Sequence, residues 1–281
     1  MAEMNGRDRG QLLLVAGVLL AVLFVALALL INAAIYTDNV ATRGDDPAGE
    51  ALTYQAGVTD AVGDLIDAEN AAADEGDGFG TVNGSVTSGV SEIDAAVARN
   101  NLGRAAATET TVSRATEGRL IRERNVDGFE SWETNASAVR GFVIDLDTDN
   151  MTADSSFVID LDGTELEVNK TGGNVVVEGG VDDATCETNA DGTVRFDVTG
   201  ERIDGDVCRF GWPTLDGDSN VTFENGTHAG GSYELTVASG EDPTGPQTTP
   251  AVYSVDLALR MDTPELRYET TVTVAPGEHD G

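Results

Sequence analysis

The sequence predicts an α+β protein with an N-terminal transmembrane helix, a helical stalk region and a C-terminal antiparallel β-sandwich-like domain. Three observations predict it: a long apolar run near the N-terminus, apolar residues at helical spacing after that run, and alternation of apolar and polar residues in the second half. We therefore expect a transmembrane helix over 11–37, a helical extracytoplasmic region over 38–135, a β-rich extracytoplasmic domain over 136–276 and a tail over 277–281.

The N-terminal apolar segment is long enough to cross a bilayer. Residues 11–37 hold no charged residue, and Leu12–Ile31 is almost continuously apolar. Such a run, at ~1.5 Å per residue, matches the ~30 Å of a hydrocarbon core. Arg7 and Arg9 precede the segment and only Arg43 follows it closely, so the N-terminus is expected in the cytoplasm and the rest of the chain outside. The sequence thus predicts a single-pass protein of the cell membrane.

The front edge of this segment resembles an archaeal class III, or prepilin-type, signal. From Arg7 to Val15 the chain reads RDRGQLLLV, a short charged leader that ends in glycine and is followed by an apolar run. The resemblance implies a cytoplasmic leader over 1–10, a cut by a prepilin peptidase between Gly10 and Gln11, and a hydrophobic helix that stays on the mature protein. Val15 stands where bacterial pilins commonly carry glutamate, which is a departure from that pattern.

The longer run from Arg9 to Ala41 is similar to pilin-like membrane proteins of haloarchaea. This resemblance implies a non-enzymatic structural or assembly subunit of a cell envelope, with other pilin-like subunits as partners. Two alternatives stay open. One is an uncut signal anchor that tethers an extracellular β-domain binding a glycan or an envelope protein. The other is a cleaved secretory signal, for which Ala26 and Ala28 supply small residues.

The charge balance is strongly acidic. The chain has 50 acidic and 16 basic residues, a formal net charge of −34, and Lys170 is its single lysine. Such a charge repels nucleic acid, so no nucleic-acid partner is expected. A disordered acidic tail is disfavoured because 40% of the residues are hydrophobic and the acids are dispersed. The composition instead resembles that of proteins from extremely halophilic archaea, which fold in high salt.

The region after the apolar segment shows helical periodicity. Two amphipathic stretches are expected, marked by Val58, Val62, Leu65 and Ile66 and by Val90, Ile93 and Val97. The glycine-rich and acidic segment from Asp74 to Gly84 predicts a loop between them. Arg119 and Glu123, spaced i,i+4, indicate an exposed helix with ion pairs. The alternative is that the six cations from Arg99 to Arg124 bind an anionic partner.

The second half of the chain reads as short strands. Alternating runs predict strands at 142–146, 157–161, 174–177, 194–198 and 233–237. The clearest alternation runs from Tyr253 to Met261 and continues from Leu266 to Val274, so we expect these two strands to form a hairpin. Many short strands at such spacing are typical of a β-sandwich.

Two kinds of covalent modification are predicted for an extracytoplasmic chain. Cys186 and Cys208, the only cysteines, are expected to form a structural disulfide, although two unpaired thiols are the alternative. Six Asn-x-Ser/Thr sequons are candidate glycosylation sites, although loops rich in asparagine and threonine also generate such sequons by chance. The acceptor residues are Asn83, Asn135, Asn150, Asn169, Asn220 and Asn225.

No residue pattern indicates catalysis, so we expect no enzyme, no cofactor and no metal. His228 and His279 are the only histidines, and the chain carries no nucleophile elbow or phosphate-binding loop. Asp145, Asp147 and Asp149 alternate as at the start of a calcium loop, but the glycine and the closing glutamate of such a loop are missing. We interpret them as a solvated acidic turn.

Overall fold

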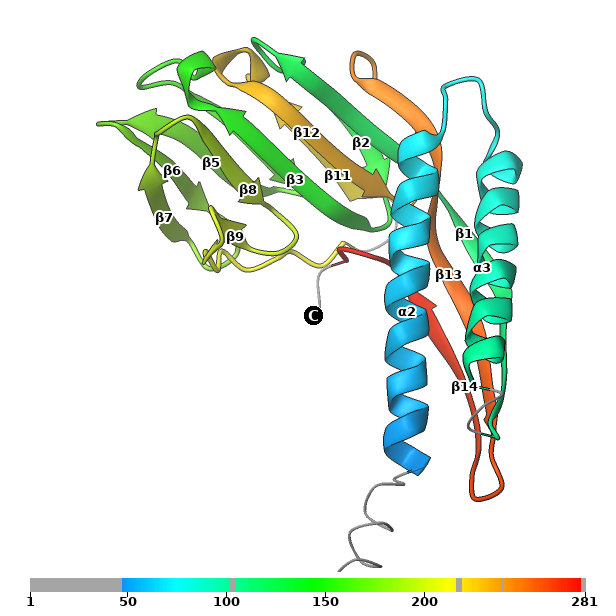
Figure 1. The fold of residues 1–281 in the computed structure, drawn as a ribbon. Coiled ribbons are helices and arrows are strands. Elements are labelled where there is room, and N and C mark those ends of the chain that lie inside the picture. The colour runs from blue at the N-terminus through cyan, green and yellow to red at the C-terminus, as the bar shows by residue number, and fades with distance from the viewer. Residues whose placement is uncertain (1–46, 102–104, 216–218, 239, 279–281) are drawn as a thin grey trace, which may run out of the picture. The chain divides into compact units, whose positions relative to one another are not determined.

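The structure, a computed structural model, describes residues 47–101, 105–215, 219–238 and 240–278 (Figure 1). The expected leader, the expected transmembrane helix over 11–37 and the processing residues Gly10 and Gln11 lie outside the described residues. The contacts of the chain divide it into two units, 1–53 and 54–281. The first unit is described only over 47–53, the start of the first helix, and all other described residues belong to the second. Among the described helices, none is both long and apolar enough to span a membrane.

Two α-helices, α2 (Pro47–Ala72) and α3 (Phe79–Asn101), precede the strands. Their buried residues recur every four positions, as the helical spacing predicts. In α2 these are Val58, Val62 and Ile66, and in α3 they are Val82, Val86 and Val90. The loop predicted over 74–84 is shorter than expected, because α3 begins at Phe79 and continues through two glycines.

The expected helix around Arg119 and Glu123 is wrong. These residues lie in β1 (Ala107–Val126), a 20-residue strand. It pairs with β13 (Gln247–Asp262) and with β12 (Gly230–Val237), antiparallel to both. Residues four apart share a face in a helix and also in a strand, where the period is two, so their spacing could not separate the two structures. The four threonines between Thr108 and Thr116 that favour a strand are the signal that decides it.

Eight strands form the larger sheet, in the order β10-β9-β8-β3-β12-β1-β13-β14. All neighbouring pairs are antiparallel. The remaining strands are β3 (Val139–Asp147), β8 (Thr193–Asp197), β9 (Arg202–Ile203), β10 (Asp206–Val207) and β14 (Arg267–Val274). The predicted hairpin is confirmed as β13 and β14, with Val255 opposite Val274 and Asp262 opposite Arg267.

Six strands form the smaller sheet, in the order β2-β11-β4-β5-β6-β7, again with antiparallel neighbours. They are β2 (Trp132–Ala136), β4 (Ser156–Leu161), β5 (Thr164–Thr171), β6 (Asn174–Gly179), β7 (Ala184–Asn189) and β11 (Ser219–Glu224). Two short 3-10 helices, η2 (Thr148–Asn150) and η3 (Gly226–His228), lie in the connections.

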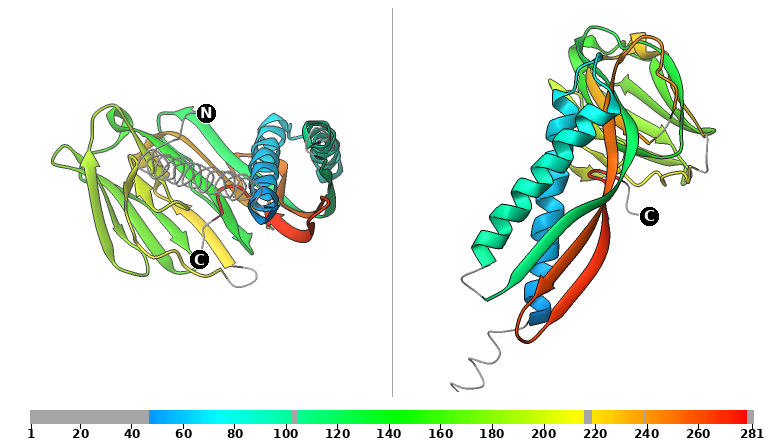
Figure 2. Two further views of the ribbon diagram at one scale, coloured as in Figure 1. Left: turned by 60° about the horizontal axis from the view of Figure 1, so that its bottom comes forward. Right: turned by 90° about the vertical axis from the view of Figure 1, so that its right-hand side faces the viewer.

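The eight-stranded sheet is covered by different partners at its two ends. Strands β3, β8 and β12 pack on the six-stranded sheet around one apolar core, whose central aromatic cluster consists of Phe129, Trp132, Phe157, Phe223 and Tyr233. The long strands β1 and β13 continue beyond this sandwich, and there α2 and α3 lie against one face of β1, β13 and β14 (Figures 1 and 2). The two long strands therefore join the sandwich to the helix-covered part.

The predicted fold class is corrected by these observations. The α+β description with a helical region over 38–135 is wrong, because the described residues are mostly β, with fourteen strands and two α-helices. The helices do not form a separate stalk; they form a layer on a sheet whose strands come from both halves of the chain. The predicted strands at 142–146, 157–161, 174–177, 194–198 and 233–237 are observed as β3, β4, β6, β8 and β12.

Candidate interaction surface

One face of the strands β1, β13 and β14 is covered by the helices. Leu257, Leu259 and Met261 of β13 are buried there. Polar contacts supplement this packing: the hydroxyls of Tyr54 in α2 and Thr110 in β1 lie 2.8 Å apart. The hydroxyl of Tyr268 donates to the side chain of Gln55 in α2. This helix-covered face is therefore closed to a partner.

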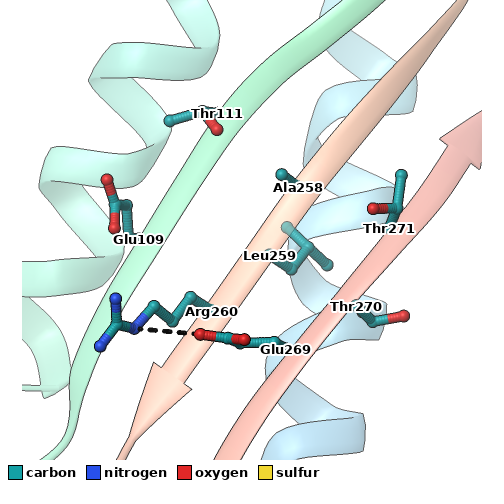
Figure 3. A pocket seen from close by; sticks show the side chains of 8 residues that line it. All are labelled: Glu109, Thr111, Ala258, Leu259, Arg260, Glu269, Thr270 and Thr271. Atoms are coloured by element: carbon teal, nitrogen blue, oxygen red, sulfur yellow. Dashed lines mark ion pairs between the residues drawn. The ribbon is translucent and has the colours of Figure 1, made fainter.

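The opposite face of the same three strands is uncovered and carries a shallow groove of about 420 Å³ (Figure 3). The register places Glu109, Arg260 and Glu269 side by side across β1, β13 and β14. In the next row, Thr111, Ala258 and Thr271 are neighbours in the same way. The groove is lined by Glu109, Thr111, Ala258, Leu259, Arg260, Glu269, Thr270 and Thr271. We call this surface the open face. Of the lining residues, Leu259 and Thr270 lie between the two rows, at positions that alternate with them, and the side chain of Leu259 is buried on the helix-covered face.

Ion pairs fix the charged end of the open face. Arg260 lies 2.6 Å from Asp262 and 3.7 Å from Glu269, and Arg267 lies 2.6 Å from Glu269. The hydrogen bonds that Arg267 donates to Glu269, then the charges of Glu269 and Asp262, raise the pKa of the Arg267 guanidinium. These side chains are largely exposed, so the pairs contribute little to the stability of the fold. The ion pairs hold charged groups next to the threonine hydroxyls of the open face. This pattern suits docking of a polar partner surface.

A polar contact anchors α2 where β13 is irregular. The pairing of β1 with β13 shifts register so that Tyr253 is an extra residue between Val252 and Ser254. Asn70 of α2 donates from Nδ2 to the carbonyl of Val252 at 2.9 Å and accepts from its N–H at 2.8 Å. Asn70 is only 2% exposed. The side-chain amide thus pairs with both backbone polar groups of Val252 beside the bulge.

A buried arginine, Arg140 of β3, binds the same segment of β13. Its guanidinium donates to the carbonyls of Tyr253 at 2.7 Å, Val252 at 3.1 Å and Pro276 at 2.7 Å. It also forms an ion pair with Asp67 of α2 at 3.0 Å and lies over the Tyr253 ring. With 2% of its surface exposed, Arg140 ties α2, β3, β13 and the segment after β14 together. We call Asn70 and Arg140 with these partners the polar junction.

Glu123 and Tyr233 form a second group with perturbed titration, at the edge of the sandwich core. Burial raises the pKa of the Glu123 carboxyl, and the charge of Glu130 adds to the rise. The backbone N–H of Glu130 opposes it by donating to Glu123 at 3.1 Å. Burial and the nearby Glu123 raise the pKa of the Tyr233 hydroxyl. Tyr233 and the adjacent Trp132 are almost completely buried, so this part of the group belongs to the core.

The structure joins Cys186 and Cys208 in a disulfide. Cys186 lies on β7, an edge strand of the six-stranded sheet, and Cys208 directly follows β10, an edge strand of the eight-stranded sheet. Their Cα atoms lie 5.8 Å apart, and the two residues are 22 positions apart in the sequence. The bond therefore links the same end of both sheets of the sandwich.

The predicted acceptor asparagines lie at different sites. Three lie on the six-stranded sheet, namely Asn135 on β2, Asn169 on β5 and Asn220 on β11, and Asn225 directly follows β11. Asn83 lies in α3 and Asn150 in η2.

The acidic turn from Asp145 to Asp149 is built by protein contacts. Asp147 accepts hydrogen bonds from the backbone N–H of Asp149 and from Asn150, both at 3.0 Å. Asp145 pairs with Arg195 at 3.1 Å. Within the described part of the chain, no group of three or more His, Cys, Asp or Glu residues could hold a metal ion. His228 contacts the carbonyl of Ser156 through Nδ1 at 2.9 Å, and His279 lies outside the described residues.

The sequence patterns missed the polar junction entirely. Asn70 follows the apolar stripe of α2 by four residues after Ile66, so its helical position faced the sheet. Arg140 stands two positions before the first predicted strand and carries no comparable signal. A polar residue in line with an apolar stripe is the pattern that could have identified Asn70 as a buried contact.

Comparison with known proteins extends over only part of the chain. Residues 6–145 match a family of unknown function (DUF7261). No curated protein and no solved structure matches the chain. The matched part ends within β3, so it contains α2, α3, β1, β2 and Arg140 but little of the six-stranded sheet. The similarity therefore includes the α2 and β3 side of the polar junction and assigns no activity.

Proposed function

We propose that the protein is a non-enzymatic, single-pass surface protein, and that it serves as a pilin-like structural or assembly subunit of a haloarchaeal cell envelope. The N-terminus lies in the cytoplasm and the chain after residue 37 lies outside it in this proposal. The observation that carries it is the prepilin-type run from Arg7 to Val15, with Gly10 and Gln11 at the junction of charged leader and apolar segment. Its partners are the membrane, a prepilin peptidase and other pilin-like subunits.

Two features of the described residues support this proposal. First, the chain enters the folded part through α2, which is held on an antiparallel sheet by Asn70 and Arg140. A helix packed in this way on such a sheet is the general build of pilins, which is an analogy of fold only. Second, the disulfide between Cys186 and Cys208 suits an oxidising compartment outside the cytoplasm.

The mature N-terminus tests the proposal. Mass spectrometry of the protein from its native membrane is expected to find a chain that begins at Gln11. Gly10→Leu is expected to abolish the cut, because a side chain at that position blocks the approach of the peptidase to the backbone. Gly6→Leu, a matched change elsewhere in the leader, is expected to leave processing intact. A wild-type chain that retains residues 1–10 would defeat the pilin-like proposal.

The open face favours a second candidate function, a tethered β-domain that binds a glycan or an envelope protein. Ala258 lies in the groove between Thr111 and Thr271, so Ala258→Arg fills it without touching the helix-covered face. On this hypothesis the variant loses retention on isolated cell envelopes, while Thr185→Arg on β7 retains it. Equal retention of both variants and the wild type would rule out binding through the open face.

A further inference from the structure

The outer face of the six-stranded sheet is acidic and carries no outward-facing cation among the described residues. Because side chains alternate along a strand, the positions that alternate with the core-facing ones in these six strands define this face. Its acids are Glu133, Asp160, Glu165, Glu167, Glu178, Glu187 and Glu224. The one cation in these strands, Lys170, donates from Nζ to the carbonyl of Thr148 at 2.6 Å. The face is therefore suited to remain in water rather than to dock on another copy of this acidic chain.

Two acceptor asparagines of this face are direct neighbours. Asn135 on the edge strand β2 and Asn220 on β11 are register partners, although 85 positions separate them in the chain. Both are exposed, whereas the residues on either side of them are buried. Directly opposite residues of an antiparallel pair have Cβ atoms only ~5 Å apart. A sugar attached to one amide therefore occupies the space in front of the other.

Two other sequons present their amides poorly. Asn83 in α3 is half-buried, and its side-chain Oδ1 is buried without a hydrogen-bond partner. Asn150 in η2 uses its Nδ2 to donate to Asp147 at 3.0 Å. The Nδ2 atom is the one that must carry the sugar. It is engaged in Asn150, and Asn83 is less exposed than Asn135 and Asn220.

We propose that Asn135 and Asn220 form one shared glycosylation site, at which a folded molecule carries an N-linked glycan on one of the two residues but not on both. The inference rests on the extracytoplasmic location in the proposed function. In the reaction, Nδ2 bonds to the anomeric carbon of a lipid-linked oligosaccharide phosphate donor. The bond from that carbon to the phosphate oxygen breaks, the lipid phosphate leaves with the electron pair, and the amide loses one proton.

A glycan at this site has a consequence for assembly. It covers the β2 and β11 end of the outer face, where Glu133 and Glu224 also lie. A branched sugar and unpaired carboxylates both oppose close protein contact there. Contacts between subunits are thereby directed to the eight-stranded sheet, on which the open face lies.

The test is intact mass spectrometry of the folded protein from the cells that naturally produce it, in an Asn225→Gln background that removes the next sequon. Molecules with one glycan at the pair are expected, and glycopeptide maps are expected to find that glycan on Asn135 in some molecules and on Asn220 in others. Independent sites would give a doubly modified fraction equal to the product of the two separate occupancies. The observed doubly modified fraction is expected to be below one tenth of that product. Asn135→Gln is expected to raise the occupancy of Asn220, and Asn220→Gln that of Asn135. Asn169→Gln, a matched loss of a sequon on β5, is expected to leave both unchanged.

Three results would overturn the inference: doubly modified molecules at the frequency of independent sites, modification of Asn83 or Asn150 in place of the pair, or no glycan at the pair at all. None of these decides the proposed function, because cleavage after Gly10 is read from the N-terminus of the same sample. A cut chain with an empty or doubly occupied pair refutes the shared site alone. An intact leader on a chain with a singly occupied pair refutes the pilin-like proposal alone.

Discussion

The two sheets differ most in the charged residues of their strands and in how these residues pair. The strands of the eight-stranded sheet contain eleven acidic residues and nine arginines, whereas those of the six-stranded sheet contain seven acidic residues and one lysine. Every ion pair found in the described residues uses an arginine of the eight-stranded sheet. The six-stranded sheet instead places like charges opposite each other, Asp160 beside Glu165 and Glu167 beside Glu178.

The two sheets of this acidic chain are therefore stabilised by different interactions. The six-stranded sheet relies on its apolar core and on the disulfide, and its outer face tolerates repulsion that salt screens. The eight-stranded sheet must also hold two helices and an irregular strand, and there it relies on directional polar contacts in the polar junction. The largest effects of substitution are therefore expected at buried polar residues of the eight-stranded sheet and the smallest on the outer face of the other.

Arg140→Met tests the polar junction most severely. The substitution leaves the carbonyls of Val252, Tyr253 and Pro276 without this donor. Hydrogen bonds to charged groups contribute ~1.5–3 kcal/mol each, so a loss of ~3–5 kcal/mol is expected. We expect this loss in the free energy of unfolding, measured by urea in high salt. Arg195→Met, which removes an exposed pair with Asp145, is the control and is expected to cost less than ~1 kcal/mol. Equal losses for the two variants would mean that the polar junction stabilises the fold no more than an exposed ion pair does.

Replacing both Cys186 and Cys208 by serine tests how much the disulfide stabilises the sandwich. Closing a loop of this length restricts the unfolded chain by ~3 kcal/mol on the entropic account, and the double variant is expected to lose about that much. The reduced wild type is expected to unfold at the same urea concentration as the double variant. Hydrogen exchange is expected to increase mainly in β7, β9 and β10, next to the bond. An increase confined to α2 would contradict the assignment of the disulfide to the sandwich.

Asn70→Ala tests the junction from the helix side. Val252 keeps Arg140 as a partner for its carbonyl but loses the acceptor of its N–H, and a buried unpaired donor costs ~1–3 kcal/mol. We expect the loss to appear as faster amide exchange in α2, with the six-stranded sheet unchanged. Asn189→Ala, at an exposed position of β7, is the matched control. Faster exchange in both sheets would show that the helices and the sandwich unfold as one unit.

The two regions also differ in how far their sequences predict them. In the sandwich, the alternation of Phe142 to Leu146 and similar runs predicted the strands, because each has one wet and one buried face. In the helix-covered part, β1 is half-buried by helices on one face and open on the other, and its Arg and Glu residues at four-residue spacing fit a helix equally well. The polar junction could not be predicted, because Asn70 and Val252 are 182 residues apart and only the folded chain brings them together.

The outer face of the six-stranded sheet gives the smallest predicted effect and the clearest dependence on salt. Glu167 lies opposite Glu178 across β5 and β6, and like charges in this position repel each other. Glu167→Lys replaces repulsion by attraction and is expected to stabilise the fold by ~0.5 kcal/mol at low salt. The gain is expected to vanish at molar salt, where the screening length falls to ~3 Å.

Glu133→Lys is the control for this last prediction, because its register partner on β11 is Thr222. It changes the net charge of the chain by the same amount without a facing carboxylate. A smaller gain than that of Glu167→Lys, measured by urea unfolding across a salt series, would show that the acid row itself is the source of repulsion. Equal gains would mean that only the total charge of the chain matters, and the contrast between the two sheets would then have no energetic meaning.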